Sequence, residues 1–198
     1  MRLKEEFEKQ FNEAYFKNRN AETKHKIEAL RWIAYFDPTT ILDYGCGQGI
    51  RVHELVKQGA IAYGYDISKW AIENPYGLSA GRIFTELPNG KFDLIICYDL
   101  LEHLYEDEID DVLHNISSRL SSEGAVIFSI PFIGDPNLNL DHTHVTKKTR
   151  VWWENKLTAH NLRVTRENYT KTGSGDDYFL FPHQMIIARA LVPMEAKK

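Results

Sequence analysis

The sequence predicts an α/β fold: a mainly parallel sheet with helices on both faces and an antiparallel hairpin at one edge. Three observations predict it. Segments of strand length alternate with helical segments from residue 40 to residue 132. Residues 92–100 are nearly continuously apolar, as expected of a strand covered on both faces. Only residues 171–183 separate the last two predicted strands, and so short a connection allows them to pair antiparallel.

Apolar periodicity defines the elements in chain order. Two N-terminal segments have apolar residues at helical spacing, and Pro38 ends the second of them. Beyond it, strands alternate with short helices, one of which Ser68 is placed to cap. The expected elements are helices at 3–18 and 21–36, a strand at 40–44, a helix at 50–58, a strand at 60–68, a short helix before Pro75, a weakly marked strand at 81–87, a strand at 92–100, an amphipathic helix at 109–120 and a strand at 124–132.

The C-terminal third is expected to begin with a loop at 133–146 and to end in strands at 162–170 and 184–192. A helix that holds Trp152, Trp153 and Leu157 lies between the loop and these strands. The aromatic residues of this part are mostly expected in the core, although some are placed to line a substrate wall. They are Trp152, Trp153, Tyr178, Phe179 and Phe181.

Composition favours one globular domain over residues 1–198. The chain has 198 residues, 43% of them hydrophobic, which suffices for one core and is short for two. No apolar run approaches the length of a membrane span. Residues 1–11 mix both signs of charge, unlike a signal or transit peptide, so we expect a cytoplasmic location.

Charge and cysteine content exclude several classes of function. The formal net charge of −4 makes a nucleic-acid partner an unlikely expectation, because such proteins normally carry a basic stripe. Basic clusters at 24–26 and 147–150 fit solvated surfaces and leave an RNA or anionic substrate open. Cys46 and Cys97 are too few for a disulfide framework and have no metal-ligand spacing.

The segment ILDYGCGQGI (41–50) places glycines at 45, 47 and 49 directly after a predicted strand. Glycines permit a tight turn and close approach of a ligand to the backbone, and ligands bind at the carboxyl ends of such strands. Asp66 ends the next strand, where a carboxylate can accept both hydroxyls of a ribose. The spacing GxGxG is not the dinucleotide pattern GxGxxG, and Asp43 would repel a pyrophosphate but suit an ammonium or sulfonium.

Four segments resemble the successive signature segments of class I S-adenosylmethionine-dependent methyltransferases. They are ILDYGCGQG, GYDIS, FDLIICYDLLEHL and LSSEGAVIFSIP, which lie in order between about 39 and 132. The resemblance implies a Rossmann-like, seven-stranded sheet with S-adenosyl-L-methionine across its carboxyl edge. It also implies methyl transfer to a nucleophile, with S-adenosyl-L-homocysteine as the product.

The resemblance assigns cofactor contacts by position. The glycine turn would pass under the methionine portion, with Asp43 at its amino end and Tyr98 beside it. Asp66 would hold the ribose, and the N-terminal helices (1–36), residues 14–16 among them, would cover the cofactor. The implied cofactor-binding residues are Asp43, Gly45, Cys46, Gly47, Gly49, Asp66, Ile67, Glu86, Leu87 and Tyr98.

Methyl transfer from a sulfonium needs aligned reactants and, for a hydroxyl acceptor, a base. Candidates follow the fourth and fifth strands: Asp99, Glu102, His103, Asp141, His142 and His144. In DLLEHL (99–104), Glu-His is structural in many relatives, whereas Asp99-x-x-Glu102-His103 with a later His resembles the Mg²⁺ site of small-RNA 3′-terminal ribose methyltransferases. The first residue of that site is Glu, so we expect no metal.

The segment LDHTHVTKKTRVWW (140–153) is the more individual feature. It resembles a segment of class I enzymes that act on small molecules or glycans, and it leads us to place substrate-side elements at 133–183. In an extended segment His142 and His144 would point the same way. We expect His144 to be the general base, with His142 and then His103 as the next candidates; the alternative is that Asp141 and the histidines cap a loop.

The sequence therefore predicts a methyltransferase, with O-methylation of a small molecule or glycan as the favoured reaction. The alternatives are a metal-dependent RNA ribose methyltransferase, a non-catalytic S-adenosylmethionine-binding protein and, more distantly, a nicotinamide oxidoreductase. The oligomeric state stays open.

Overall fold

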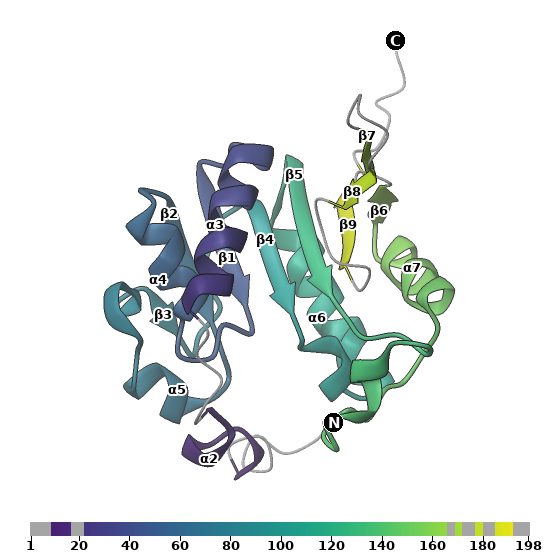
Figure 1. Cartoon of the computed structure of the whole chain (residues 1–198), viewed down its shortest axis with the longest axis horizontal. Coiled ribbons are helices and arrows are strands. Elements are labelled where there is room, and N and C mark those ends of the chain that lie inside the picture. The colour runs from purple at the N-terminus through teal and green to yellow at the C-terminus, as the bar shows by residue number, and fades with distance from the viewer. Residues whose placement is uncertain (1–8, 17–21, 166–168, 172–176, 180–184, 192–198) are drawn as a thin grey trace. The chain divides into compact units, whose positions relative to one another are not determined.

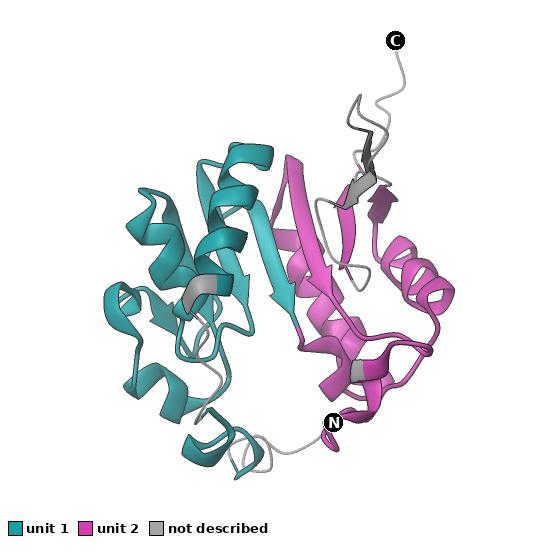
Figure 2. Ribbon diagram, viewed as in Figure 1, with its two compact units in different colours: residues 1–98 teal, residues 99–198 magenta. Residues whose placement is uncertain are grey.

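The computed structural model describes residues 9–16, 22–165, 169–171, 177–179 and 185–191 (Figure 1). Seven strands form one sheet in the order β3-β2-β1-β4-β5-β9-β6, and helices accompany them. The chain divides into two compact units, residues 1–98 and 99–198, which are described in turn (Figure 2). The predicted single domain over residues 1–198 stays a prediction.

The strands of unit 1 are all parallel. Asp43 near the end of β1 pairs with Gly64 of β2 on one side and with Ile96 of β4 on the other. The carboxyl ends of these three strands therefore share one edge. The elements are α2 (Glu13–Phe16), α3 (Glu22–Phe36), β1 (Thr40–Tyr44), α4 (Ile50–Lys57), β2 (Ile61–Tyr65), α5 (Lys69–Glu73), η1 (Gly77–Ser79), β3 (Ile83–Phe84) and β4 (Phe92–Tyr98).

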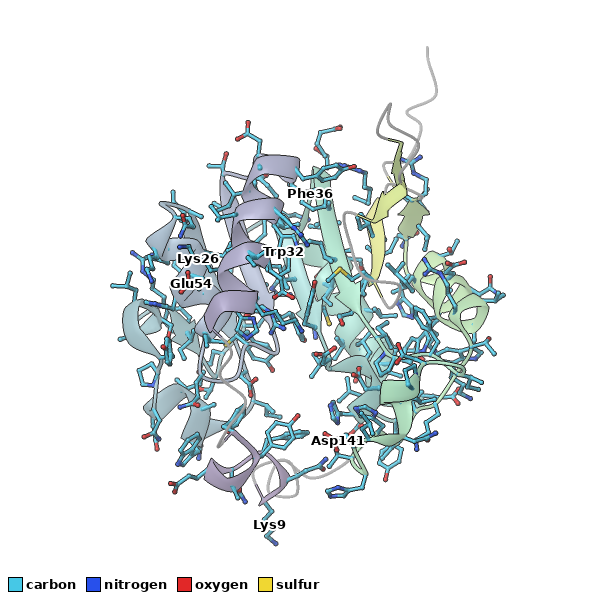
Figure 3. The ribbon with its side chains drawn as sticks, viewed as in Figure 1. Lys9, Lys26, Trp32, Phe36, Glu54 and Asp141 are labelled. Carbon is cyan, nitrogen blue, oxygen red and sulfur yellow. The ribbon has the colours of Figure 1, made fainter. Side chains whose placement is uncertain are left out.

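The core of unit 1 explains why its strands are apolar throughout. Ile41 and Leu42 of β1 are fully buried, as are the central residues of β4, because helices cover the sheet. Trp32 of α3 (labelled in Figure 3) is 1% exposed. Its ring lies edge-on to that of Tyr98, with 5.4 Å between the ring centroids. This contact fixes α3 over the end of β4.

Unit 2 contains the antiparallel part of the sheet. β9 pairs antiparallel with β5 through Ile127 and Ile187, and antiparallel with β6 through Val164 and Ala188. A separate two-stranded sheet joins β7 and β8. The elements are η2 (Leu101–His103), α6 (Glu106–Arg119), β5 (Leu120–Ser129), η3 (Pro136–Asn139), α7 (Arg150–Ala159), β6 (Leu162–Thr165), β7 (Tyr169–Lys171), β8 (Asp177–Phe179) and β9 (Met185–Ala190).

The structure confirms the predicted fold class, the antiparallel pairing of the last two long strands and the cap at Ser68. The hydroxyl of Ser68 accepts a hydrogen bond from the backbone N–H of Ala71, 3.2 Å away. Within the described part of the chain, no helix is long and apolar enough to cross a membrane.

Three predicted elements differ from the observed ones. The helix at 3–18 is interrupted within its described part, because the side chain of Asn12 accepts a hydrogen bond from Ala14 N–H and α2 begins only at Glu13. The strand at 81–87 contains only Ile83–Phe84, so Glu86 and Leu87 follow it in a bend and loop. The predicted strand at 162–170 contains β6, which ends at Thr165, and the first two residues of β7, whereas β8 lies within 171–183, which was expected to be a loop. Phe181 lies outside the described residues.

Candidate functional site

The glycine turn between β1 and α4 adopts a backbone that only glycine accommodates without strain. Gly47 and Gly49 have φ values of 53° and 76°, in the left-handed region. A Cβ on Gly49 would lie 2.7 Å from the Cβ of Ser79, and one on Gly47 would lie 2.8 Å from the ring of Phe16. Glycine is therefore required at both positions, by the backbone conformation of the turn and by the side chains packed against it.

Asp43 lies at the end of β1, directly before this turn, and is only 1% exposed. Neither of its carboxylate oxygens has a hydrogen-bond partner among the described residues. Burial raises the pKa of Asp43 to about 6, against the opposing effect of the nearby Arg51 charge. A buried carboxylate without a hydrogen-bond donor is costly, and a ligand with a cationic amino group would supply what it lacks.

Asp66 follows β2 and ties the end of that strand to the glycine turn. One carboxylate oxygen accepts the N–H of Gly47 at 2.7 Å, and the other accepts the N–H of Ser68 at 2.8 Å. Burial raises the pKa of Asp66, while these two hydrogen bonds oppose the rise. Each oxygen keeps a second lone pair, so the same carboxylate can also accept hydroxyl donors of a ligand.

Arg51, on the first turn of α4, was not predicted as a site residue. Its guanidinium lies over the ring of Tyr98, 4.4 Å from the centroid, and 3.6 Å from Glu28. Burial raises the pKa of Glu28, but the hydrogen bond with His25 and the charge of Arg51 lower it below its usual value overall. A positive charge at a helix N-terminus interacts unfavourably with the helix dipole. This unfavourable position of Arg51 was the one feature of the sequence that could have marked it as a site residue.

An aromatic pair lies against the turn. Phe16 of α2 stacks on Trp70 of α5, with centroids 5.7 Å apart and rings within 10° of parallel. The hydroxyl of Ser68 also donates to the backbone oxygen of Phe11 at 2.7 Å. Phe16 thus lies against the glycine turn, while the expectation that residues 14–16 fold over the cofactor stays a prediction. Trp70 was missed because its helix has only five residues and no clear periodicity.

Unit 2 holds a second polar cluster, formed by Glu102, His103 and His144. One ligand atom of each lies within 4.8 Å of the others. Glu102 is 1% exposed, and neither of its carboxylate oxygens has a hydrogen-bond partner among the described residues. Burial, and then the negative charges of Asp99 and Asp141, raise its pKa well above the usual value.

Backbone hydrogen bonds hold the loop after β5 against η2. The N–H groups of Val145 and Thr146 both donate to the backbone oxygen of Glu102, at 2.9 and 3.0 Å. The hydroxyl of Thr146 donates to the backbone oxygen of Leu104 at 2.6 Å. These bonds bring His144 to Glu102, with 3.9 Å between His144 Nε2 and Glu102 Oε1.

Hydrogen bonds at Nδ1 fix the tautomers of both buried histidines. His144 Nδ1 lies 2.9 Å from the backbone oxygen of Leu138, which can only accept, so Nδ1 donates. The hydroxyl of Thr143 donates to Asp141 (labelled in Figure 3) and therefore accepts from His103 Nδ1, 2.8 Å away. In the neutral form of each ring the lone pair is consequently on Nε2.

The segment 141–144 is a turn and not the extended segment that was expected. The backbone N–H of Thr143 donates to the Asp141 carboxylate at 2.9 Å, which closes the turn. His142 is exposed, whereas the side chain of His144 is 9% exposed. The expectation that both histidines point the same way is therefore wrong, because alternation holds only in a strand.

The remaining predicted residues have diverse surroundings. Asp99 is exposed, has a φ of 49° and accepts a hydrogen bond from the Ser129 hydroxyl at 2.7 Å. Trp153 is fully buried in the core, whereas Lys148 lies over the ring of half-buried Trp152, 5.0 Å from its centroid. The side chains of Tyr178 and Phe179 lie outside the described part of β8.

Comparison with known proteins identifies the family. Residues 15–170 match the family model described as a methyltransferase domain, which covers most of the chain. The chain belongs to the methyltransferase domain family. The resemblance drawn from the signature segments is thereby confirmed.

Named relatives match part of this methyltransferase domain. It is 30% identical over 101 residues to the ubiquinone biosynthesis O-methyltransferase of Vibrio campbellii, over 45% of this chain and 42% of that protein. It is also 30% identical over 101 residues to the chloroplastic magnesium protoporphyrin IX methyltransferase of Arabidopsis thaliana, over 46% of this chain and 32% of that protein. The chain spans about half the length of the ubiquinone enzymes it matches.

Solved structures share the fold. Magnesium protoporphyrin IX methyltransferase from Synechocystis PCC 6803 with bound S-adenosylhomocysteine has a TM-score of 0.65 at 17% identity, over 95% of this chain and 100% of that chain. The 1,6-didemethyltoxoflavin-N1-methyltransferase of Burkholderia thailandensis has the same TM-score at 18% identity, over 97% and 92% of the two chains. These similarities confirm the Rossmann-like methyltransferase fold.

Proposed function

We propose that this methyltransferase domain transfers a methyl group from S-adenosyl-L-methionine to a hydroxyl group of a small molecule. The observation that carries the proposal is Asp43, a buried carboxylate without a hydrogen-bond partner at the entrance to the glycine turn. Asp43 places a negative charge directly before a turn of glycines, which have no side chains, and this arrangement suits a cationic amino acid moiety. The family membership of residues 15–170 supports the same reaction.

The residues of unit 1 fit the cofactor group by group. Asp43 would hold the amino group, and Asp66 would accept the ribose hydroxyls on its remaining lone pairs. The glycine turn would lie against the methionine portion, with Phe16 covering it and Tyr98 beside it. The adenine contacts at Ile67, Glu86 and Leu87 stay predictions, as does that of Cys46.

The acceptor must lose a proton before or during transfer. When bound, S-adenosylmethionine would supply an electrophilic methyl group on its positively charged sulfur, with S-adenosylhomocysteine as the leaving group. In unit 2, the cluster of Glu102, His103 and His144 is suited to take up the proton that the acceptor loses. Both imidazoles are oriented by fixed Nδ1 donors, and the role of His144 as general base stays a prediction.

A small molecule is favoured over the other acceptors considered. The relatives that match are named ubiquinone biosynthesis O-methyltransferase and magnesium protoporphyrin IX methyltransferase. The net charge of −4 disfavours a polyanionic acceptor such as RNA. A glycan acceptor stays open within the same chemistry, because it too presents hydroxyl groups.

The proposal is tested by calorimetric titration with S-adenosylhomocysteine, followed by a screen of phenols, sugars and short RNAs with radiolabelled S-adenosylmethionine. We expect saturable binding that Asp66→Ala weakens roughly tenfold or more, since charge-assisted hydrogen bonds are lost. We also expect transfer of label to a hydroxyl compound. Failure to bind would exclude the cofactor, and tight binding with transfer to RNA alone would exclude the small-molecule acceptor.

A further inference from the structure

Glu102, His103 and His144 of unit 2 each bring one potential ligand atom to within 4.8 Å of the other two. Glu102 is buried and neither carboxylate oxygen has a hydrogen-bond partner. Among the described residues, its ion-pair neighbour is His144, and no lysine or arginine lies within ion-pair distance. Because a buried carboxylate is strongly destabilised unless a positive charge compensates it, the cluster lacks a cation.

The two histidines are prepared as ligands by their neighbours. His144 Nδ1 donates to the Leu138 backbone oxygen, and His103 Nδ1 donates to Thr143, whose hydroxyl is held by Asp141. Such partners fix the ring and leave Nε2 with the lone pair, as is usual for histidines that bind metal ions. The centroids of the His103 and His144 rings are 4.8 Å apart and the ring planes are inclined by 70°, and one ring nitrogen of each lies within 4.8 Å of a Glu102 carboxylate oxygen.

We propose that Glu102, His103 and His144 bind one divalent transition-metal ion, of the Mn²⁺ to Zn²⁺ series, through one carboxylate oxygen and two Nε2 atoms. Two imidazoles and one carboxylate suit these ions better than Mg²⁺ or Ca²⁺, which prefer oxygen ligands. Ligand atoms about 2.1 Å from one ion lie at most about 4.2 Å apart. The present spacing of up to 4.8 Å therefore requires a small closure of the side chains.

This ligand set differs from the one that the sequence suggested. Asp99 accepts a hydrogen bond from Ser129 and is exposed, so it does not belong to the set. His144, from the loop after β5, takes its place. The expectation of a metal-free protein is replaced by this proposal.

The ion would act on the acceptor, a part of the inference that rests on the proposed function. Three protein ligands leave open coordination positions, and a hydroxyl bound there ionises more readily because the cation lowers its pKa. Its proton would leave to solvent, and direct proton transfer to His144 would not be needed. Binding of the ion itself depends only on the three side chains.

The test uses tag-free full chain, treated with EDTA, desalted and titrated with Co²⁺ by calorimetry and visible absorption. We expect one ion per chain, with binding weakened at least tenfold in Glu102→Gln and in His144→Ala. The matched control is His142→Ala, which removes an exposed histidine two residues away and should bind Co²⁺ within about twofold of the unchanged protein. No saturable binding, or an equal loss in both histidine variants, would overturn the proposal.

A second measurement on the unchanged chain does not depend on how variants fold. Diethylpyrocarbonate, read out by mass spectrometry, should modify His142 with or without Co²⁺, whereas Co²⁺ should protect His144. Equal modification of His144 in both conditions contradicts the site. Titration with S-adenosylhomocysteine separates the two proposals: metal binding without cofactor binding refutes the function alone, and cofactor binding without metal binding refutes the metal site alone.

Discussion

At the scale of single residues, two buried carboxylates dominate the chain. Asp43 and Glu102 are each 1% exposed, and no hydrogen bond satisfies either carboxylate. Burial is the main cause of the raised pKa in both. They differ in their neighbours, because Asp43 has backbone glycines and Arg51 nearby, whereas Glu102 has two imidazoles. The first environment suits an organic cation, and the second suits a metal ion.

The raised pKa of Asp43 predicts pH-dependent cofactor binding. The charged carboxylate should attract the amino group of S-adenosylhomocysteine, and it becomes protonated below its pKa of about 6. Affinity should therefore fall about tenfold between pH 7.5 and pH 5, since about one-tenth of the group stays ionised one unit below its pKa. Calorimetric titration across this range measures the effect. Asp43→Asn should bind weakly at every pH, and Asp111→Asn on the surface of α6 should keep the pH dependence.

The same shift predicts a stability cost in the protein without cofactor. An acid whose pKa is higher in the folded than in the unfolded state costs no stability at a pH below both values, where it is protonated in both states. It destabilises the folded state increasingly as the pH rises from the unfolded-state pKa to the folded-state pKa. Here that interval runs from 3.8 to about 6, which corresponds to on the order of 3 kcal/mol. Asp43→Asn should raise the free energy of unfolding at pH 7.5, as measured in urea. A destabilised variant would mean that the Asp43 carboxylate has a partner in solution.

At the scale of elements, the β1–α4 connection shows that packing against neighbours can require a glycine in addition to its positive φ. Gly49 and Gly59 both have positive φ, at 76° and 90°. A Cβ on Gly59 would meet nothing within 4 Å, whereas one on Gly49 would overlap Ser79 and Ile83. The loop after β5 follows the same principle, since its hydrogen bonds to Glu102, and not its own periodicity, determine where His144 lies.

These two glycines provide a matched pair of substitutions. Gly59→Ala should lower the free energy of unfolding by about 1–2 kcal/mol, the cost of a left-handed alanine. Gly49→Ala should cost about 1–3 kcal/mol more, because crowding against Ser79 adds to it. Urea unfolding of both variants compares them directly. Equal losses would show that Ser79 and η1 move away at little cost.

At the scale of the whole molecule, the family match extends over residues 15–170, and the two clusters proposed to bind ligands belong to different compact units. The proposed cofactor contacts with described side chains lie in residues 1–98, and the proposed metal ligands lie in residues 99–198. Each ligand should therefore stabilise its own set of elements, and their effects can be separated by experiment.

Hydrogen exchange should show this separation. S-adenosylhomocysteine at 100 times its dissociation constant should stabilise the protein by about 2.7 kcal/mol, because it binds only the folded state. Amide protection should increase most at the glycine turn and α5. Co²⁺ should instead protect η2 and residues 138–146. A cofactor that leaves the glycine turn unprotected would place its binding site elsewhere.

The parallel α/β architecture, the glycine turn and the acidic residues at the ends of β1 and β2 were predictable from the sequence alone. These features depend on local patterns: apolar strands, residues that allow positive φ, and fixed spacing along the chain. The break at Asn12 was misjudged, since a side-chain hydrogen bond outweighed helical periodicity there. The third strand is shorter than predicted and contains only Ile83–Phe84.

Which polar residues after β4 and β5 come together depends on tertiary contacts that the sequence does not reveal. Glu102 and His144 are far apart in sequence and meet because Val145 and Thr146 donate to the Glu102 backbone oxygen. The tautomers of His103 and His144 depend on Thr143 and Leu138, which no motif connects to them. Contacts of this kind arise from the folding of a loop onto another element, and residue spacing alone carries no information about them.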